Sequence, residues 1–198
     1  MKIPPGVVWR PFKDAGEIAC AAAREWVGLL RRRPDRRRPW CVALSGGRIA
    51  PKLYAAVVEE TGPDRDLWDG VEFFFADERW VPLDDPESNY RLAREGLFDP
   101  LNIPTARRHG LAGPDREFAV AQAQARLLLR APTTPEGHPI FDLVILGMGE
   151  DGHVASIFPQ NLASLADSRA VWVPVEGPKP PPERLTLTPA VLAAAREA

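Results

Sequence analysis

Short apolar runs alternate with helical patterns along the chain. Four runs predict β-strands, at residues 40–44, 71–76, 141–146 and 170–175. The second and third are continuously apolar, which is typical of parallel strands covered on both faces. Helical spacing and capping residues predict helices over 14–30, 51–60, 89–98, 115–130 and 189–198. This alternation predicts an α/β fold with a doubly wound, mostly parallel sheet and helices on both faces.

The first predicted helix is amphipathic. Ile18, Ala22, Trp26 and Leu29 share one face, and Asp14 stands where an N-cap is expected. We therefore expect that face to pack on the sheet or on a neighbouring helix. Ser88 and the pair Thr188-Pro189 are predicted to begin two later helices in the same way.

Composition adds limits to this picture. A chain of 198 residues predicts a single domain over 1–198, and a net charge of −2 argues against a nucleic-acid partner. Cys20 and Cys41 fall in apolar patterns and are expected to be buried and reduced. No apolar run approaches the ~18 residues that cross a bilayer, and the N-terminus does not resemble a signal peptide. We expect a cytoplasmic monomer or small homo-oligomer without a membrane partner.

One charged segment leaves an alternative open. The stretch RRRPDRRRP at 31–39 contains six arginines in nine residues. A solvated connection after the first helix and a nucleic-acid patch both fit that composition. The absence of interleaved aromatic residues before Trp40 favours the connection.

Polar loops follow all four predicted strands. In an open α/β sheet, ligands bind beyond the carboxyl ends of the strands. The loops there are SGGR (45–48), DERWVP (77–82), GMGEDGH (147–153) and EGPKPPPER (176–184). Each is rich in glycine, proline or charge, so we expect them to form one site.

The first two loops suit an anion. Gly46 and Gly47 allow the backbone to approach a ligand, and the following helix start favours a phosphate. Ser45 and Arg48 can add hydrogen bonds, although the Walker pattern is absent. In the second loop, Arg79 can bind a phosphate in bidentate fashion. The alternatives are a tight turn without a ligand and a salt-bridged strand end.

The third loop has two interpretations, of which the first is a nucleotide site. GMGEDG matches the glycine pattern of dinucleotide sites, and Asp167 lies near the offset of the expected acidic residue. Pro159 interrupts the following helix, and Glu150 and Asp151 place negative charge where a pyrophosphate would lie. The motif also follows a late strand rather than the first one, so the nucleotide interpretation is disfavoured.

The second interpretation is catalytic. His153 is expected at or near a helix start, whose positive end disfavours imidazolium and leaves a neutral general base. Asp151 can orient the ring or hold a substrate hydroxyl, and N–H groups near 147–149 can stabilise an oxyanion. The alternative to a catalytic role is a structural one, in which Asp151 caps a helix and the ring nitrogens of His153 are hydrogen-bonded within the protein. His109 and His138 are expected at the surface, and no cluster has metal-ligand spacing.

Four motifs together resemble one family. ALSGGRIAP, FFFADERWVPLDDPESNY, FDLVILGMGEDGHVASIFP and GPKPPPERLTLT occur in the order and spacing of 6-phosphogluconolactonases, from about Trp40 to Thr188. The resemblance implies a Rossmann-like fold of the sugar-phosphate isomerase and lactonase type. Glucosamine-6-phosphate deaminases share the glycine turn and its histidine, but ASIFP and the arginine of DERWVP are lactonase-like.

The resemblance implies hydrolysis of 6-phospho-D-glucono-1,5-lactone in the pentose phosphate pathway, without a metal or organic cofactor. It implies that His153 activates the water, that Asp151 lies beside it, and that Arg79, Lys179 and Arg184 hold the phosphate. With the loop analysis, the expected substrate-binding set is Ser45, Gly46, Gly47, Arg48, Asp77, Arg79, Gly149, Lys179 and Arg184.

Two departures from the family pattern stand out. Arg48-Ile49 replaces the usual Ser-Thr after the glycines, so Arg48 either substitutes for the lost hydroxyls or points away. The chain also stops at Ala198, whereas lactonases continue for a few tens of residues, so we expect a shortened C-terminus and an exposed sheet edge.

The alternative functions are a glucosamine-6-phosphate deaminase and a non-catalytic sugar-phosphate sensor. Residues 1–39 are too short for a sensor's helix-turn-helix as well as the first helix.

Overall fold

The computed structural model describes residues 6–33, 35–166 and 168–198, so Asp167 lies outside the described residues. The helices are α1 (Ala15–Arg32), α2 (Ala50–Thr61), α3 (Asn89–Ala93), α4 (Arg116–Leu128), α5 (Leu162–Leu165) and α6 (Pro189–Ala193). The strands are β1 (Trp40–Leu44), β2 (Val71–Phe75), β3 (Asp77–Arg79), β4 (Leu143–Val144), β5 (Trp172–Glu176) and β6 (Glu183–Leu187). No described helix combines the length and the apolar character that a membrane span requires.

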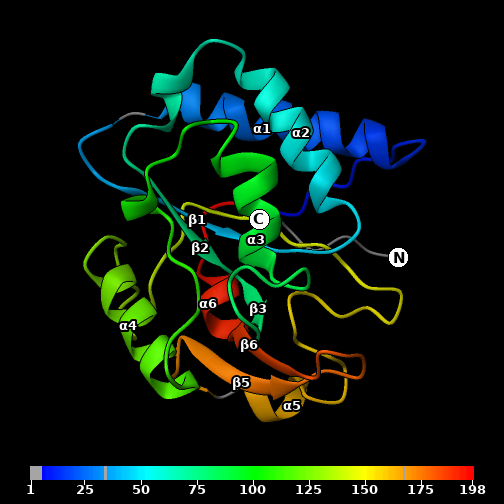
Figure 1. Ribbon diagram of the computed structural model, residues 1–198, viewed down its shortest axis with the longest axis vertical. Coiled ribbons are helices and arrows are strands. Elements are labelled where there is room, and N and C mark those ends of the chain that lie inside the picture. Colours follow the sequence, from blue (N-terminus) through cyan, green and yellow to red (C-terminus); the bar gives the residue numbers. More distant parts are fainter. Residues whose placement is uncertain (1–5, 34, 167) are drawn as a thin grey trace.

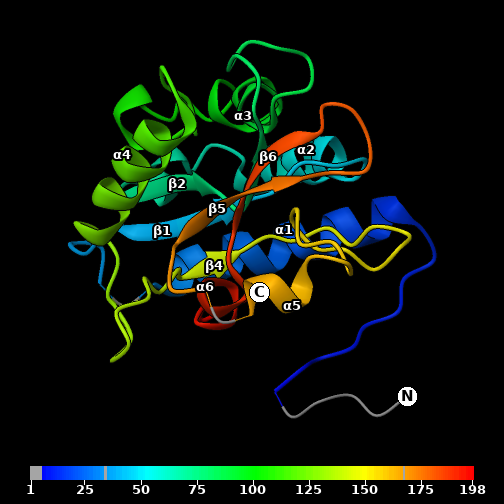
Figure 2. The same ribbon diagram turned by 90° about the horizontal axis from the view of Figure 1, so that it is seen from below.

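The predicted parallel sheet is present, in the order β2-β1-β4 (Figure 1). Trp40 pairs with Val71, and Val42 pairs with Leu143. In the view of Figure 2, α3 and α4 lie on one side of β1 and β2, and α5 and α6 lie on the other. The α/β class with helices on both faces is therefore confirmed.

A second sheet was not predicted as such. It is antiparallel, in the order β3-β6-β5, and it contains the fourth predicted strand. Ala76 joins the two sheets, because its N–H donates to Leu44 O (2.7 Å) and its carbonyl accepts from Leu187 N (2.7 Å). The chain thus leaves the parallel sheet at Ala76 and enters the antiparallel one within a single residue. As a result, the first three residues of DERWVP form strand β3 rather than the loop that was predicted.

Side chains cap the helices largely where the sequence predicts them. The Asp14 carboxylate accepts from Gly16 N (2.7 Å) and the Ser88 hydroxyl from Arg91 N (3.2 Å). Thr188 stands at the start of α6, but its hydroxyl donates to Ala170 O (2.8 Å) rather than capping the helix.

The helix predicted to run to residue 198 is too long, since α6 ends at Ala193. The chain then turns along the free edge of β4. Arg196 N donates to Phe141 O (3.0 Å) and Val144 N donates to Glu197 O (2.9 Å). Backbone pairing with β4 replaces the helical hydrogen bonds here.

The buried face of α1 differs from the predicted one. Ala19, Ala23, Trp26, Val27 and Leu30 are buried, whereas Ile18 is 40% exposed. The rotation follows from packing, because the Trp26 ring meets Trp68 edge-on at 5.5 Å. Cys20 is consequently exposed, against the prediction, and Cys41 in β1 is buried as predicted.

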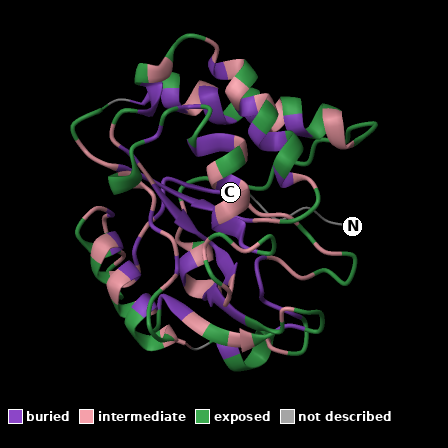
Figure 3. Cartoon of the chain, viewed as in Figure 1, coloured by how far each residue is buried: buried purple, intermediate pink, exposed green. Residues whose placement is uncertain are grey.

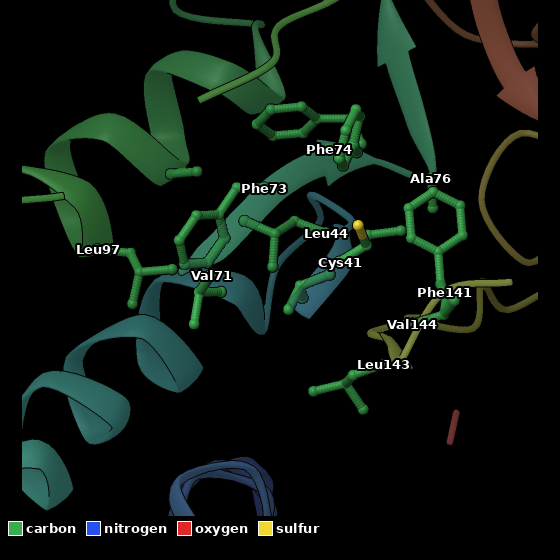
Figure 4. Packing of buried hydrophobic residues seen from close by; sticks show 14 of the residues in the cluster. Cys41, Leu44, Val71, Phe73, Phe74, Ala76, Leu97, Phe141, Leu143 and Val144 are labelled. Carbon is green, nitrogen blue, oxygen red and sulfur yellow. The ribbon is translucent and has the colours of Figure 1, made fainter. Parts of the chain in front are cut away.

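The core is centred on the parallel sheet, where buried strands lie inside partly exposed helices (Figure 3). Phe73, Phe74 and Phe75 of β2 are all fully buried. Figure 4 shows Phe73 and Phe74 near Cys41 and Leu44 of β1. Each such side chain contributes roughly 1.5–3 kcal/mol through burial, which holds the strand ends rigidly in place.

His109 is buried, which corrects the surface role predicted for it; His138 is half-buried. The His109 ring stacks on Phe74 at 4.5 Å, and its Nε2 lies 2.5 Å from a carboxylate oxygen of Glu72. Glu72 also pairs with Arg130 at 3.0 Å. The polar loop that contains His109 therefore folds inward because the half-buried carboxylate of Glu72 on β2 supplies a partner.

Candidate active site

The loops predicted to converge do meet. Arg48 of the SGGR loop pairs with Glu150 of the glycine-rich loop, with 2.7 Å between Nη2 and Oε1. A methyl group built on Gly147 would lie 4.0 Å from Gly46 O, which places the same two loops in backbone proximity. The DERWVP segment pairs as β3 with β6, the strand that follows the proline-rich turn.

Asp151 and His153 form a hydrogen-bonded pair. The imidazole Nδ1 lies 2.5 Å from Asp151 Oδ1, and the bond from the ring lowers the pKa of the Asp151 carboxyl. Gly149 N donates to His153 O (2.8 Å) and Gly152, with φ of +84°, closes the turn. Since Asp151 holds Nδ1, the ring nitrogen that remains for a substrate is Nε2.

The structure corrects one expectation for this loop and narrows another. No helix begins at His153, because the next described helix, α5, starts at Leu162; the helix dipole therefore does not act on the ring. The carboxylate of Asp151 supplies the orientation instead. The N–H of Gly149 is also committed to His153 O, so it is not free for an oxyanion.

Phe158 connects the histidine to the arginine pair. Its ring lies 4.8 Å from the His153 ring and 5.7 Å from the guanidinium carbon of Arg184. Arg184 on β6 stands directly opposite Arg79 on β3. His153, Arg184 and Arg79 therefore occupy one continuous region, as the converging loops require.

The two arginines have few acidic partners: Arg79 forms one long ion pair, 4.0 Å, with the exposed Glu87. Burial, and then the neighbouring Arg79, lower the pKa of Arg184. Arg184 donates to the carbonyls of Pro181 and Lys179, at 3.2 Å each, and Arg79 donates to Glu87 O at 2.6 Å. The buried Nε of Arg79 has no hydrogen-bond partner among the described residues. Opposed guanidinium groups with a spare donor suit a dianion such as a phosphate monoester.

Asp77 lies buried below these arginines. Ser156 donates to its Oδ2 (2.7 Å), and the Asn89 side-chain amide donates to its backbone carbonyl (2.9 Å). Burial raises the pKa of the Asp77 carboxyl, while Arg79 and Arg184 oppose that rise. The negative charge of Asp77 attracts both guanidinium groups, and a buried carboxylate does not itself favour an anion.

The SGGR loop is packed tightly against Asn89. A methyl group on Gly46 would lie 1.9 Å from the Asn89 side-chain oxygen, and Gly47 has φ of +94°. The Ser45 hydroxyl is buried without a partner among the described residues. Helix α2 starts without a side-chain cap, but Ala50 N donates to Gly47 O (3.2 Å) and Pro51 has no N–H, so its first turn offers few free donors.

Four contributors were not predicted as site residues: Glu78, Asn89, Ser156 and Phe158. Glu78 is buried and accepts from Asn89 N (2.7 Å), Tyr90 N (2.8 Å) and Arg79 N (2.8 Å). It thereby ties β3 to α3. The pair Ser88-Asn89 carried a signal, because it lies within the motif FFFADERWVPLDDPESNY. Ser156 and Phe158 carried a signal of the same kind, because both lie within FDLVILGMGEDGHVASIFP.

Comparisons with known proteins identify the family. The family model described as glucosamine-6-phosphate isomerases/6-phosphogluconolactonase matches residues 13–198. A 6-phosphogluconolactonase of Mycobacterium tuberculosis is 33% identical over 191 residues, covering 94% of this chain and 76% of that protein. One of Streptomyces coelicolor is 36% identical over 193 residues, covering 93% and 74%.

Solved structures of 6-phosphogluconolactonases share the fold of this chain. The 6-phosphogluconolactonase of Trypanosoma brucei superposes with a TM-score of 0.77 at 28% identity, covering 94% of this chain and 78% of that one. That of Thermotoga maritima gives 0.75 at 30% identity, covering 93% and 78%. A monomeric glucosamine-6-phosphate deaminase, 17% identical with a TM-score of 0.71, shares the fold. The chain thus belongs to the glucosamine-6-phosphate isomerase/6-phosphogluconolactonase family.

Proposed function

We propose that this protein hydrolyses 6-phospho-D-glucono-1,5-lactone to 6-phospho-D-gluconate, in the oxidative branch of the pentose phosphate pathway and in the cytoplasm. One observation carries the proposal: an Asp151–His153 pair packs on the same aromatic ring as Arg184, which stands opposite Arg79. A base and an anion site therefore lie on one surface. The relatives named above support the lactone as substrate.

Binding begins at the phosphate. Arg79 and Arg184 supply guanidinium donors, and the exposed Lys179 adds a positive charge from the turn before β6. The Ser45 hydroxyl, which has no partner among the described residues, supplies a neutral donor. Anchoring the phosphate among these groups orients the lactone ring toward the glycine-rich loop.

Chemistry follows at His153. Its Nε2 accepts a proton from a water molecule, whose oxygen attacks the lactone carbonyl carbon. Asp151 holds Nδ1–H and stabilises the imidazolium that forms. When the tetrahedral intermediate collapses, the bond from the carbonyl carbon to the ring oxygen breaks, and the imidazolium returns the proton to that oxygen. The products are the free hydroxyl and the carboxylic acid of the sugar, which releases its proton to the solvent to give the carboxylate; water is the sole co-substrate.

The test measures lactone hydrolysis after subtraction of the spontaneous reaction. General-base catalysis contributes about 10²–10⁴-fold, so His153→Ala should lower kcat by that factor without unfolding the protein. Arg79→Ala should chiefly raise KM. Unchanged turnover in His153→Ala would remove the histidine as base, and an unchanged KM in Arg79→Ala would remove that arginine from the phosphate site.

The same preparation separates the alternatives. Ammonia release from glucosamine 6-phosphate would identify a deaminase. Binding of the phosphosugar without turnover of either substrate would identify a sensor domain.

A further inference from the structure

Glu150 occupies an unusual place at the rim of the site. Its carboxylate lies 2.7 Å from Arg48, and both side chains are almost fully solvent-exposed, at 85% and 90%. The hydrogen bond from Arg48, followed by the charges of Arg48 and Lys179, lowers the pKa of the Glu150 carboxyl. Glu150 thus contacts Arg48 and is influenced by the charge of Lys179, which comes from a different loop.

These basic residues flank the phosphate donors. Arg48 follows Gly46 and Gly47 in the loop that leads into α2, and Lys179 precedes Arg184, whose guanidinium donates to the Lys179 carbonyl. A phosphate held at this edge of the sheet would attract both cations. In the structure, the side-chain carboxylate of Glu150 is the anion that Arg48 contacts.

We propose that Glu150 is an internal competitor of the substrate phosphate: it holds Arg48 at the rim and releases it when the phosphosugar binds. This inference rests on the proposed function, because it assumes that the phosphate binds at the Arg79–Arg184 pair. It gives Arg48 a role in substrate affinity, and it assigns Glu150 as the residue that sets the strength of that affinity.

The exchange is energetically easy. A solvent-exposed ion pair is weak, because water screens the charges and both side chains lose freedom when they pair. A phosphate dianion carries more charge and offers more acceptor oxygens to a guanidinium than a single carboxylate does. Removing the competing carboxylate should therefore tighten phosphate binding by a modest factor, about two- to fivefold.

The test measures binding of inorganic phosphate by calorimetry, and KM for the lactone, in Glu150→Gln. We expect both constants to fall two- to fivefold relative to wild type, with kcat nearly unchanged and with a smaller gain at high salt. Glu59→Gln is the matched control, since it removes one exposed carboxylate from α2 and should leave both constants unaltered. The gain should vanish when Arg48→Ala is added to Glu150→Gln.

Each outcome decides one point. Unchanged or weaker phosphate binding in Glu150→Gln, in a protein whose affinity still falls with Arg79→Ala, would overturn this inference and leave the proposed function intact. A gain that persists without Arg48 would also overturn it. If Arg79→Ala has no effect on phosphate affinity either, the phosphate binds elsewhere and this inference falls, whereas the proposed lactone hydrolysis is decided by its own assay.

Discussion

Gly149 lies against the Asp151–His153 pair with no room for a side chain. A methyl group at this position would lie 2.2 Å from His153 Cε1, 2.3 Å from Nδ1 and 2.7 Å from Asp151 Oδ1. The backbone of Gly149 is not in the left-handed region, so the substitution Gly149→Ala tests steric contact alone. The imidazole ring has to move, because carbon atoms pack at about 3.5–4.0 Å.

The required movement sets the size of the effect. Restoring normal contact displaces the ring by more than about 1 Å, and a misplacement of that size costs on the order of 10²-fold in rate. We expect kcat of Gly149→Ala to fall by about that factor. KM should change much less, because the arginines that hold the phosphate lie on β3 and β6.

The assay is background-subtracted lactone hydrolysis, combined with a thermal unfolding curve. Gly147→Ala is the control in the same loop, since the nearest atom to its added methyl group is Gly46 O at 4.0 Å. It should keep most of the activity. A Gly149→Ala enzyme with kcat within about twofold of wild type would refute the argument that this contact sets the histidine geometry.

Two further predictions concern stability. Burial raises the pKa of Glu78 from 4.5 to about 7, so the folded state holds a proton that the unfolded state releases between these values. The free energy of unfolding should fall as the pH rises through this window, by up to about 3 kcal/mol from this group. Urea titrations should show a shallower pH slope for Glu78→Gln, and equal slopes would contradict the assignment. Gly46→Ala, which sets a methyl group 1.9 Å from the Asn89 oxygen, should cost about 1–3 kcal/mol, and adding Asn89→Ala should recover part of it; additive losses would contradict the clash.

Periodicity predicts the parallel sheet well, because burial on both faces leaves a continuous apolar run such as that of β2. Asp14 and Ser88 were predictable as helix caps because capping depends only on residues close in the sequence. The antiparallel sheet was not predictable in this way. Asp77 and Glu78 are charged residues in a buried strand, and their burial depends on donors from α3 and Ser156 that only the tertiary structure brings near.

The site shows the same division. The loops of His153 and Arg79 were identified from their residues and from their positions after strands, and the structure brings them together. The position of His153 at a helix start was wrong, since the next described helix begins at Leu162, whereas the expected orienting role of Asp151 agrees with its hydrogen bond to the ring. Which residues stand opposite Arg79 depends on strand register, so its pairing with Arg184 could not be found from spacing.

The opposition of Arg79 and Arg184 has a consequence for handling the protein. Like charges directly across a strand pair destabilise a sheet, so an anion resting between them would bind the native state and not the unfolded chain. Melting temperatures would then depend on the buffer anion, rising with phosphate or sulfate concentration by mass action. The difference in melting temperature between the wild type and a variant of this pair would therefore be larger in phosphate than in an amine buffer. Such variants have to be compared in one buffer with one counter-ion.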